Sequence, residues 1–314
     1  MIKKTLYFGN PTYLSLKNNQ LVIKLPEIEN NITLPEGFKE SSVKIVPVED
    51  IGIIILDNKQ ISITQGLIES LLQNNVALVS CDSSRMPIGM MLPLSVNSIQ
   101  NERFRSQINA SVPLSKQLWQ QTIQQKIRNQ SKLLEYETKY PHPNMMKWAD
   151  SVKSGDIENM EARAAAYYWK NLFINYGIIN FVRGRKDLPP NNLLNYGYAI
   201  LRAIIARSIV STGLLPTIGI HHHNRYNAYC LADDIMEPYR PYVDKQILCL
   251  ISKGCDYINL TKEIKSELLS ISAIISLILN KFNFVCSNFF SDSAFLVLYF
   301  TIPAASSKIC LLSS

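Results

Sequence analysis

The sequence predicts an α+β protein in which a small N-terminal β-rich domain precedes a larger, all-helical domain. In the first 95 residues, apolar positions alternate with polar ones or gather in β-branched runs, whereas from about Ile99 apolar residues recur with helical period. The length of 314 residues suits roughly two domains. We therefore expect a β-rich domain over 1–95, a helical domain over 96–271 and an atypical tail over 272–314.

The N-terminal domain opens with a hairpin pattern, because apolar residues alternate over 14–17 and again over 21–25, on either side of Asn18-Asn19. A short helix is expected to begin near Thr64, and the apolar segment that starts at Met86 is expected to end the domain. The remaining strands are predicted over apolar and β-branched runs, at Val43–Val48, Ile51–Leu56, Ile61–Thr64 and Val76–Cys81.

The helical domain is predicted from two long periodic segments. Apolar residues between Leu118 and Leu134 fall on one broad helical face. A second helix is expected over Asn191–Thr212, where Asn192 can cap the start and Gly213 lies where a C-terminal cap belongs.

Composition excludes a wholly disordered chain, since 47% of residues are hydrophobic and 18% are charged. The net charge of +7 is compatible with a polyanionic partner such as nucleic acid, although many basic proteins bind none. The six cysteines form no CxxC pair, no signal peptide is recognisable, and no charge-free apolar run reaches the ~18 residues of a membrane helix. We expect a cytoplasmic protein with reduced thiols and no membrane association.

A glutamate interrupts an apolar helix face in the segment from Asp156 to Ile174, where Asp156 is a plausible N-cap. The apolar side of this helix gathers Ile157, Ala164, Ala165, Tyr168 and Leu172. Glu161 falls in the middle of that side, where an ionised carboxylate is costly unless a cation or metal accompanies it. Glu161 is therefore a candidate functional residue. The alternative is a glutamate that pairs with a buried arginine or faces a subunit interface.

Three consecutive histidines, His221 to His223, follow a loop-like segment. If that segment is extended, His222 shares a face with Ile218 and Ile220, which makes it the most sheltered of the three rings. Imidazole is a common ligand of divalent ions and a common acid–base group. The alternative is a solvated polar loop.

Acidic residues follow on the next predicted helix. Asp233 and Asp234 flank its apolar side about equally, so periodicity does not choose between them. Glu237 is nearly opposite that side and is either a solvated residue or a second acid near the site. A Glu, a His and an Asp from three separate elements would suit Mg²⁺ or Mn²⁺, because carboxylates are hard oxygen ligands and Mn²⁺ tolerates imidazole.

A basic segment lies between the glutamate and the histidines. It carries Arg183, Arg185 and Lys186, and Arg225 follows the histidines. Arginine pairs well with phosphates, so these residues are candidates for DNA binding. For each of them the alternative is a solvated basic loop.

Several of these segments together resemble one known family. They are SGDIENMEARAAAYYW from Ser154, RGRKDLPPNNLLNYGYAIL from Arg183 and TGLLPTIGIHHHNRYNAYCLADDIMEPYRPYVD from Thr212. They are similar to the CRISPR-associated protein 1 family, the integrase of CRISPR adaptation, and most similar to its type II branch. An N-terminal stretch, PVEDIGIIILDNKQISITQGLIESLLQNNVALVSCD, is similar too, so that the resemblance covers residues 1 to about 271.

The resemblance implies an N-terminal β-domain that dimerises and a helical catalytic domain. It implies a homodimer that joins CRISPR-associated protein 2 in a heterohexameric integration complex. The implied activity is metal-dependent insertion of short DNA fragments into the CRISPR array by 3′-hydroxyl attack on repeat-end phosphodiesters, with nuclease activity on double-stranded and branched DNA. The family's catalytic and metal-binding Glu, His and Asp match Glu161, His222 and Asp234, and the ion would be Mg²⁺ or Mn²⁺.

The chain departs from the family at its end. The tail from Ser272 holds three charged residues and six of the eleven phenylalanines, which suggests a frameshifted or misassembled gene end. Two other functions stay open at this point. One is a stand-alone nuclease or transposon-type integrase of the same family, and the other is a catalytically inactive DNA-binding scaffold.

Overall fold

The computed structural model describes residues 3–184 and 188–269, which form two compact units. Within these residues, unit 1 comprises 3–109, 196–216 and 260–269, and unit 2 comprises 110–195 and 217–259. The predicted domains, 1–95 and 96–271, are contiguous, whereas the units alternate along the chain. The reason is that one long helix, α8 (Asn191–Ser211), begins in unit 2 and continues in unit 1. The predicted tail over 272–314 lies outside the described residues.

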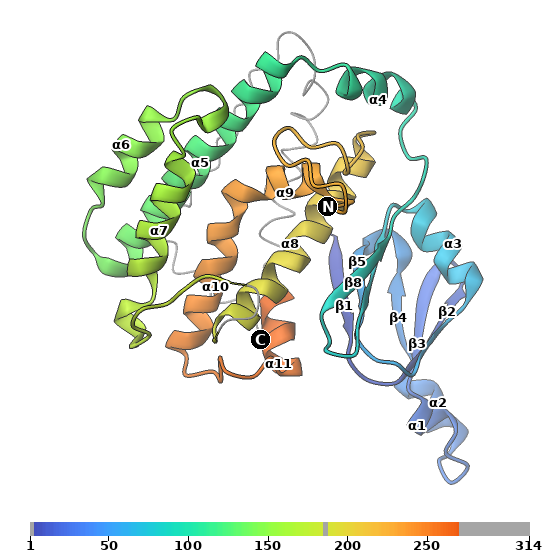
Figure 1. Cartoon of the computed structure of the whole chain (residues 1–314). Helices are drawn as coiled ribbons and strands as arrows, with labels where there is room; N and C mark the ends of the chain where they lie inside the picture. Colours follow the sequence, from blue (N-terminus) through green and yellow to red (C-terminus); the bar gives the residue numbers. More distant parts are fainter. Residues whose placement is uncertain (1–2, 185–187, 270–314) are drawn as a thin grey trace. The chain divides into compact units, whose positions relative to one another are not determined.

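Unit 1 contains two four-stranded sheets (Figure 1). The first has the order β1-β5-β7-β8, in which β1, β5 and β7 are parallel and β8 is antiparallel to β7. Its members are β1 (Lys4–Phe8), β5 (Ile51–Leu56), β7 (Ala77–Cys81) and β8 (Pro87–Met91). Because β5 lies between two strands, its residues 51–55 are all buried, which explains its continuous apolar sequence.

The second sheet is built around the predicted hairpin and has the order β4-β3-β2-β6. Its members are β2 (Thr12–Lys17), β3 (Gln20–Lys24), β4 (Lys44–Pro47) and β6 (Ile61–Ile63). Strands β2 and β3 are antiparallel, with Leu14 opposite Ile23. Asn18 and Asn19 both have positive φ, at 50° and 57°, as a tight two-residue hairpin turn requires. The predicted hairpin is confirmed.

The core of unit 1 is formed by apolar residues from both sheets and from α3 (Gln65–Gln73), whose Leu67 and Leu71 are fully buried. The predicted helix near Thr64 and the predicted strands are therefore confirmed. Strand β1 and two short helices, α1 (Pro26–Glu29) and α2 (Glu36–Ser42), were not predicted. Neither helix has a buried residue, so no apolar stripe marks them in the sequence.

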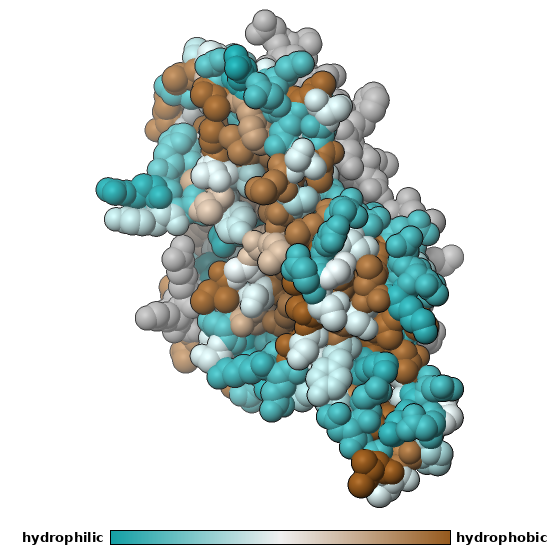
Figure 2. Space-filling model, turned by 90° about the vertical axis from the view of Figure 1, so that its right-hand side faces the viewer, coloured by the Kyte–Doolittle hydropathy of each residue, from teal (hydrophilic) through white to brown (hydrophobic). Residues whose placement is uncertain are grey.

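The α1–α2 segment projects from unit 1 and carries exposed apolar side chains. Ile32 is 94% exposed and Phe38 is 52% exposed. Figure 2 shows hydrophobic atoms at the lower tip of the molecule, where Figure 1 places this segment. The surface around it is largely hydrophilic.

A buried ion pair attaches α11 (Lys262–Leu269) to the sheets of unit 1. Lys265 Nζ lies 2.7 Å from Asp57 Oδ2, and the two side chains are 0% and 1% exposed. The ammonium also donates to the carbonyl oxygen of Arg85 at 2.8 Å, and the Tyr7 hydroxyl donates to Asp57 at 2.5 Å. A polar network thus joins the last described helix to residues near the start of the chain.

Unit 2 is helical, as predicted, and is organised around α5 (Val112–Thr138). This helix contacts α6 (Pro143–Ser151), α7 (Met160–Leu172), α9 (Cys230–Met236) and α10 (Arg240–Ser252). It also contacts two short 3₁₀ turns, η2 (Ser154–Asp156) and η4 (Glu237–Tyr239). A third turn, η3 (Ile174–Tyr176), follows α7, and a further helix, α4 (Gln100–Ile108), belongs to unit 1.

Two predicted helix starts are corrected by the structure. Helix α7 begins at Met160 rather than Asp156, with Asn159 as its N-cap, so Ile157 lies outside it and is 73% exposed. The N-cap of α8 is not Asn192, since that residue lies inside the helix and donates to the carbonyl oxygen of Ile258 at 2.8 Å. The predicted C-terminal cap of α8 is confirmed, because Gly213 has φ +76°.

The cysteines and one long apolar helix of the described residues bear on the expectations of reduced thiols and of no membrane association. Cys81, Cys230, Cys249 and Cys255 are free thiols. Helix α8 is long and apolar enough to cross a membrane, but 72% of its most apolar window is buried inside the protein. Such burial is typical of a core helix.

Replacing Lys265 by Met is expected to lower the free energy of unfolding by about 3–5 kcal/mol, because it leaves Asp57 buried without its cation. The matched control is Lys262→Met in the same helix, which removes only an exposed hydrogen bond to Asn10 and should change the free energy by less than about 1 kcal/mol. Urea unfolding of the full chain, followed by circular dichroism, measures both. Equal stabilities of the two variants would contradict this account of the network.

Candidate active site

One face of α5 supplies a buried tryptophan and a buried lysine to unit 2. Trp119 is 2% exposed and Lys126 is 7% exposed, and the spacing of seven residues places them on the same side of the helix. The apolar face that contains Trp119 is predicted from the sequence, whereas the burial of Lys126 is not. A lysine among buried helix positions is the same kind of signal that drew attention to Glu161, and it could have been found in the same way.

Glu161 lies in the first turn of α7, and its backbone is held there by Asp156. The two oxygens of the Asp156 carboxylate accept from the backbone N–H groups of Met160 and Glu161, at 2.8 and 3.0 Å. The Glu161 side chain is 28% exposed, and its Oε1 lies 2.6 Å from Lys126 Nζ. The partner of this carboxylate is therefore a buried lysine, not the arginine considered from the sequence.

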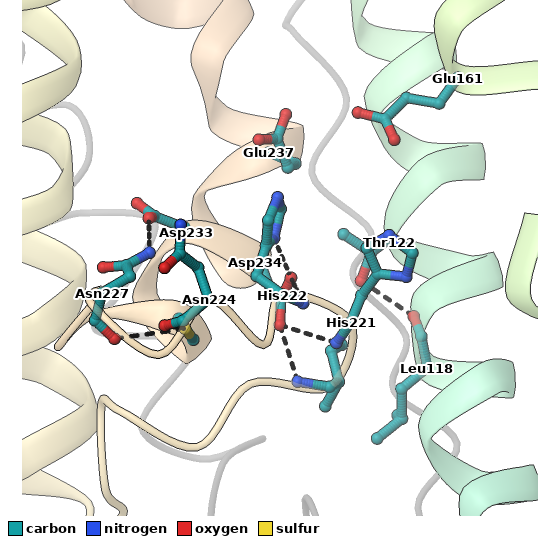
Figure 3. Close-up of polar contacts among 12 residues, drawn as sticks. Leu118, Thr122, Glu161, His221, His222, Asn224, Asn227, Asp233, Asp234 and Glu237 are labelled. Carbon is teal, nitrogen blue, oxygen red and sulfur yellow. Dashed lines mark hydrogen bonds and ion pairs between the residues drawn. The ribbon is translucent and has the colours of Figure 1, made fainter. Parts of the chain in front are cut away.

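Asp234 fixes the loop between α8 and α9 that carries the three histidines, hereafter the histidine loop. It is fully buried, and its Oδ1 lies 2.6 Å from His222 Nδ1. Its carboxylate also accepts three backbone N–H groups, from Ile220 at 2.7 Å, His221 at 3.0 Å and His222 at 3.2 Å (Figure 3). Both carboxylate oxygens are thus engaged, and Nε2 of His222 has no hydrogen bond to any described residue. Asp233 points elsewhere and accepts from Asn227 at 2.7 Å.

Gly219 allows the loop to approach Asp234 closely. A Cβ atom at this position would lie 2.7 Å from Asp234 Oδ2 and closer still to the carbonyl oxygen of His222. Asp234 Oδ2 cannot move away without breaking its hydrogen bonds to the N–H groups of Ile220 and His221. Any larger residue at 219 would therefore displace the carboxylate that orients His222.

The neighbouring ring, His221, stacks on Trp119. The ring centroids are 4.0 Å apart and the planes differ by 1°. His222 meets the same indole edge-on, with centroids 5.8 Å apart. His221 and His223 are exposed while His222 is half-buried, which confirms the prediction that His222 is the most sheltered of the three.

Glu237 is a second acid of the site and is not solvated, since it is only 3% exposed. Its Oε2 lies 2.6 Å from Lys126 Nζ, and its Oε1 lies 2.8 Å from Arg240 Nη2. The Asn129 side chain of α5 donates to the carbonyl oxygen of Pro238 at 2.8 Å and so holds the η4 turn against the helix. Figure 3 shows the Glu161 carboxylate pointing toward Glu237.

Opposite charges in the site favour each other's ionised forms. Burial by itself lowers the pKa of Lys126, but the carboxylates of Glu237 and Glu161 more than offset this, and the net pKa is raised. Burial likewise favours a higher pKa for Glu237, but Arg240 and Lys126 hold that pKa below its usual value. The hydrogen bond to Asp234 raises the pKa of His222, whereas burial lowers the pKa of His221. Both shifts favour the ionised forms, the ammonium of Lys126 and the carboxylate of Glu237.

The carboxylate and imidazole groups of the site are of the kinds that bind hard divalent ions. Two carboxylates, Glu161 and Glu237, converge on one cation, and His222 presents an imidazole whose other nitrogen is fixed by a carboxylate, as is common for metal-binding histidines. In the present arrangement the Lys126 ammonium supplies that cation, and no three His, Cys, Asp or Glu side chains within 3–184 and 188–269 are close enough to hold an ion.

The basic residues predicted to bind DNA have different surroundings. The Arg183 guanidinium donates to the side chains of Asn191 at 2.9 Å and Asn195 at 2.8 Å, so it anchors the start of α8. Arg185 and Lys186 lie outside the described residues. Arg225 is exposed on the histidine loop, 5.2 Å from the ring centroid of Tyr226.

The fold is also found in solved structures of other proteins. A solved structure described as a casposase bound to integration product matches with a TM-score of 0.69 and 20% identity, covering 96% of each chain. The chain of a Cas6-RT-Cas1–Cas2 complex matches with a TM-score of 0.66 and 17% identity, over 91% of this chain and 35% of that longer one. These likenesses define the class of fold.

The family follows from the sequence comparisons. The family model described as CRISPR associated protein Cas1 matches residues 6–256. The CRISPR-associated endonuclease Cas1 of Neisseria meningitidis serogroup C (strain 8013) is 35% identical over 270 residues, which are 86% of this chain and 83% of that relative. The chain belongs to the Cas1 family, and the resemblance found in its sequence is confirmed.

The pKa of His222 in the metal-free protein is expected to fall toward the ordinary value in an Asp234→Asn variant. A raised folded-state pKa means that the imidazolium stabilises the fold below the unfolded-state pKa, and that this contribution is lost as pH rises through the folded-state pKa. The variant should lack this part of the pH dependence. An NMR titration of the imidazole in the presence of a chelator measures the shift.

The matched control is Asp233→Asn, which keeps the contact between His222 and Asp234. Its effect on the His222 pKa should be much smaller. An equal shift in both variants would show that Asp234 is not the specific partner of His222.

Proposed function

We propose that this protein is a metal-dependent DNA endonuclease and integrase that inserts short foreign DNA fragments as new spacers into a CRISPR array. Membership of the Cas1 family supports this proposal. The observation that carries it is the site itself. Glu161 and Glu237 converge on one buried cation, beside a histidine whose orientation is fixed by a buried carboxylate.

We propose that Glu161, His222 and Glu237 would hold Mg²⁺ or Mn²⁺. The family resemblance implies Asp234 as a member of this set, but both oxygens of Asp234 already accept hydrogen bonds from the histidine loop. We therefore give Asp234 the role of orienting His222 and replace it by Glu237 as a ligand. When bound, the ion would make a hydroxyl more nucleophilic and offset negative charge on the phosphate.

The reaction proposed is a transesterification. The 3′-hydroxyl of the incoming fragment loses its proton to solvent as its oxygen attacks the phosphorus at a repeat end. A new phosphodiester bond joins the fragment to the 5′ end of the repeat, and the bond from that phosphorus to the 3′-oxygen of the flanking DNA breaks. The displaced 3′-oxygen takes up a proton and leaves as a hydroxyl. In hydrolysis, water takes the place of the 3′-hydroxyl. The protein's part is to hold its donors in place: Asp156 fixes Glu161, Asp234 fixes His222, and Arg240 fixes Glu237.

The proposed partners are a second copy of this chain, CRISPR-associated protein 2 in a heterohexameric complex, and double-stranded or branched DNA in the cytoplasm. The solved structures with this fold support such partners, since one is described as containing Cas1 and Cas2 and another as bound to an integration product. The positive net charge of the chain agrees with a polyanionic partner.

A stand-alone or transposon-type integrase is the second candidate, and the likeness to the casposase favours it. That likeness rests on 20% identity, whereas the endonuclease from Neisseria meningitidis is 35% identical over most of both chains. We therefore prefer the CRISPR function. An inactive scaffold would have no use for the arrangement of Glu161, His222 and Glu237.

Replacing Glu161 by Ala should lower the rate of strand transfer by at least about 100-fold, because a proposed ligand is removed. The assay joins a labelled DNA fragment with a free 3′-hydroxyl to a repeat-containing plasmid, with the partner protein and Mg²⁺ or Mn²⁺ present. A chelator should abolish the product. The matched control is Glu158→Ala, which removes a nearby surface carboxylate paired with Lys153 and should leave the rate within a few fold.

If Glu161→Ala joined DNA as fast as the wild type, the proposed site would be refuted. If the wild type formed no product but bound DNA, the scaffold would be favoured. Products formed in plasmids without a repeat would favour the second candidate.

Charge reversal at Arg225 should weaken DNA binding, because this exposed arginine lies on the same loop as His222. The slope of log K against log salt should fall by about 0.9 for each phosphate that the protein no longer neutralises. Binding of a labelled duplex at several salt concentrations measures the slope for Arg225→Glu. Arg225→Lys keeps the charge and should keep the slope, and an unchanged slope in Arg225→Glu would exclude pairing of Arg225 with a phosphate.

A further inference from the structure

We propose that the Lys126 ammonium is a built-in cation that holds Glu161 and Glu237 together in the metal-free protein and competes with the divalent ion for their oxygens. The inference rests on the proposed function, because it takes Glu161 and Glu237 as metal ligands. It adds a positioning residue to the site and a limit on the affinity of the site for metal.

The geometry of Lys126 is that of a bridging cation. Its Nζ lies 2.6 Å from Glu161 Oε1 and 2.6 Å from Glu237 Oε2. The two glutamates come from different elements, α7 and η4, and meet only at this nitrogen. The lysine side chain is 9% exposed and the Glu237 side chain 4%, so water screens these charges little.

Two carboxylates that close would repel each other without a positive charge between them. Lys126 contacts both glutamates and Arg240 contacts Glu237, so the two negative charges are matched by two positive charges. A divalent ion that entered beside Lys126 would break this balance and repel the ammonium. The ion and Nζ therefore exclude each other from the space between the two carboxylates.

Lysine suits such an exchange. Its ammonium is a compact charge on a long, flexible stem, so that Nζ can leave the carboxylates while the backbone of α5 stays in place. Lys265 in unit 1 is a useful contrast, because that buried ammonium has a single carboxylate partner and also bonds a backbone carbonyl oxygen. Lys265 can be explained by folding alone, whereas Lys126 bridges two residues that the proposed reaction uses.

The test is Mn²⁺ binding to the purified full chain, measured by the electron paramagnetic resonance of free Mn²⁺. Lys126→Met removes the charge but keeps an unbranched helix-forming side chain. We expect this variant to bind Mn²⁺ at least about tenfold more tightly than the wild type, since a nearby like charge is gone. Its melting temperature should be lower without metal and should rise more on addition of Mn²⁺. Lys126→Arg keeps the charge and should show no gain in affinity.

Unchanged or weaker Mn²⁺ binding in Lys126→Met would overturn the proposal. If Lys126→Met does not fold, Lys126→Gln serves as a second neutral variant. In the wild type, the side-chain ¹⁵N resonance of Lys126 should shift on addition of Mg²⁺, and an unmoved resonance would also overturn it.

Glu161→Gln separates this proposal from the proposed function. If it leaves Mn²⁺ binding at the wild-type level, the ion is bound elsewhere and the proposed metal site fails. If the wild type binds no Mn²⁺, a site that appears in Lys126→Met and disappears in Glu161→Gln/Lys126→Met supports competition by Lys126. If Lys126→Met also bound no Mn²⁺, the proposed competition by Lys126 would be overturned.

Discussion

The helical unit depends on one electrostatic constraint: buried carboxylates must be matched by cations. Glu161 and Glu237 approach the same nitrogen of Lys126, and Glu237 also contacts Arg240. Since an unpaired buried charge costs several kcal/mol, this requirement links α5, α7 and η4 more specifically than apolar packing could. Two further polar residues on the buried side of α5 support η4, since Asn129 donates to the carbonyl oxygen of Pro238 and accepts from Gln125. The site and the fold of unit 2 therefore share the same interactions.

The three acids near His222 differ in burial and partners, and hence in the chemistry available to them. Asp234 has no exposed surface and four hydrogen bonds, so it acts as a fixed support for the imidazole. Glu237 is nearly as buried, and its carboxylate forms ion pairs with Lys126 and Arg240. Glu161 keeps part of its side chain exposed to solvent. Gly219 completes this arrangement, because any side chain there would collide with the Asp234 carboxylate.

Much of the fold and part of the site could be predicted from local patterns. Alternation and β-branched runs located the strands, and paired asparagines located the hairpin turn. A carboxylate on an apolar helix face indicated Glu161 as a candidate. The alternation of faces in an extended segment indicated His222 as the most sheltered of the three histidines. Periodicity could not choose between Asp233 and Asp234, because a helical wheel records the face of a residue and not its partner. It also missed α1 and α2, which bury no residue and therefore leave no apolar stripe.

The sequence by itself determined which elements form, which residues are unusual within them, and which family the chain resembles. Tertiary structure decided which charges meet. Lys126 lies 35 residues before Glu161, and the contacts of Asp234 with the histidine loop span 12 to 14 residues. Local patterns act over a few turns of helix or a few residues of strand, whereas ion pairs between elements are set by how those elements pack. For this reason Glu161 could be picked out from the sequence, while its lysine partner and the separate contacts of Asp234 and Glu237 were visible only in the folded chain.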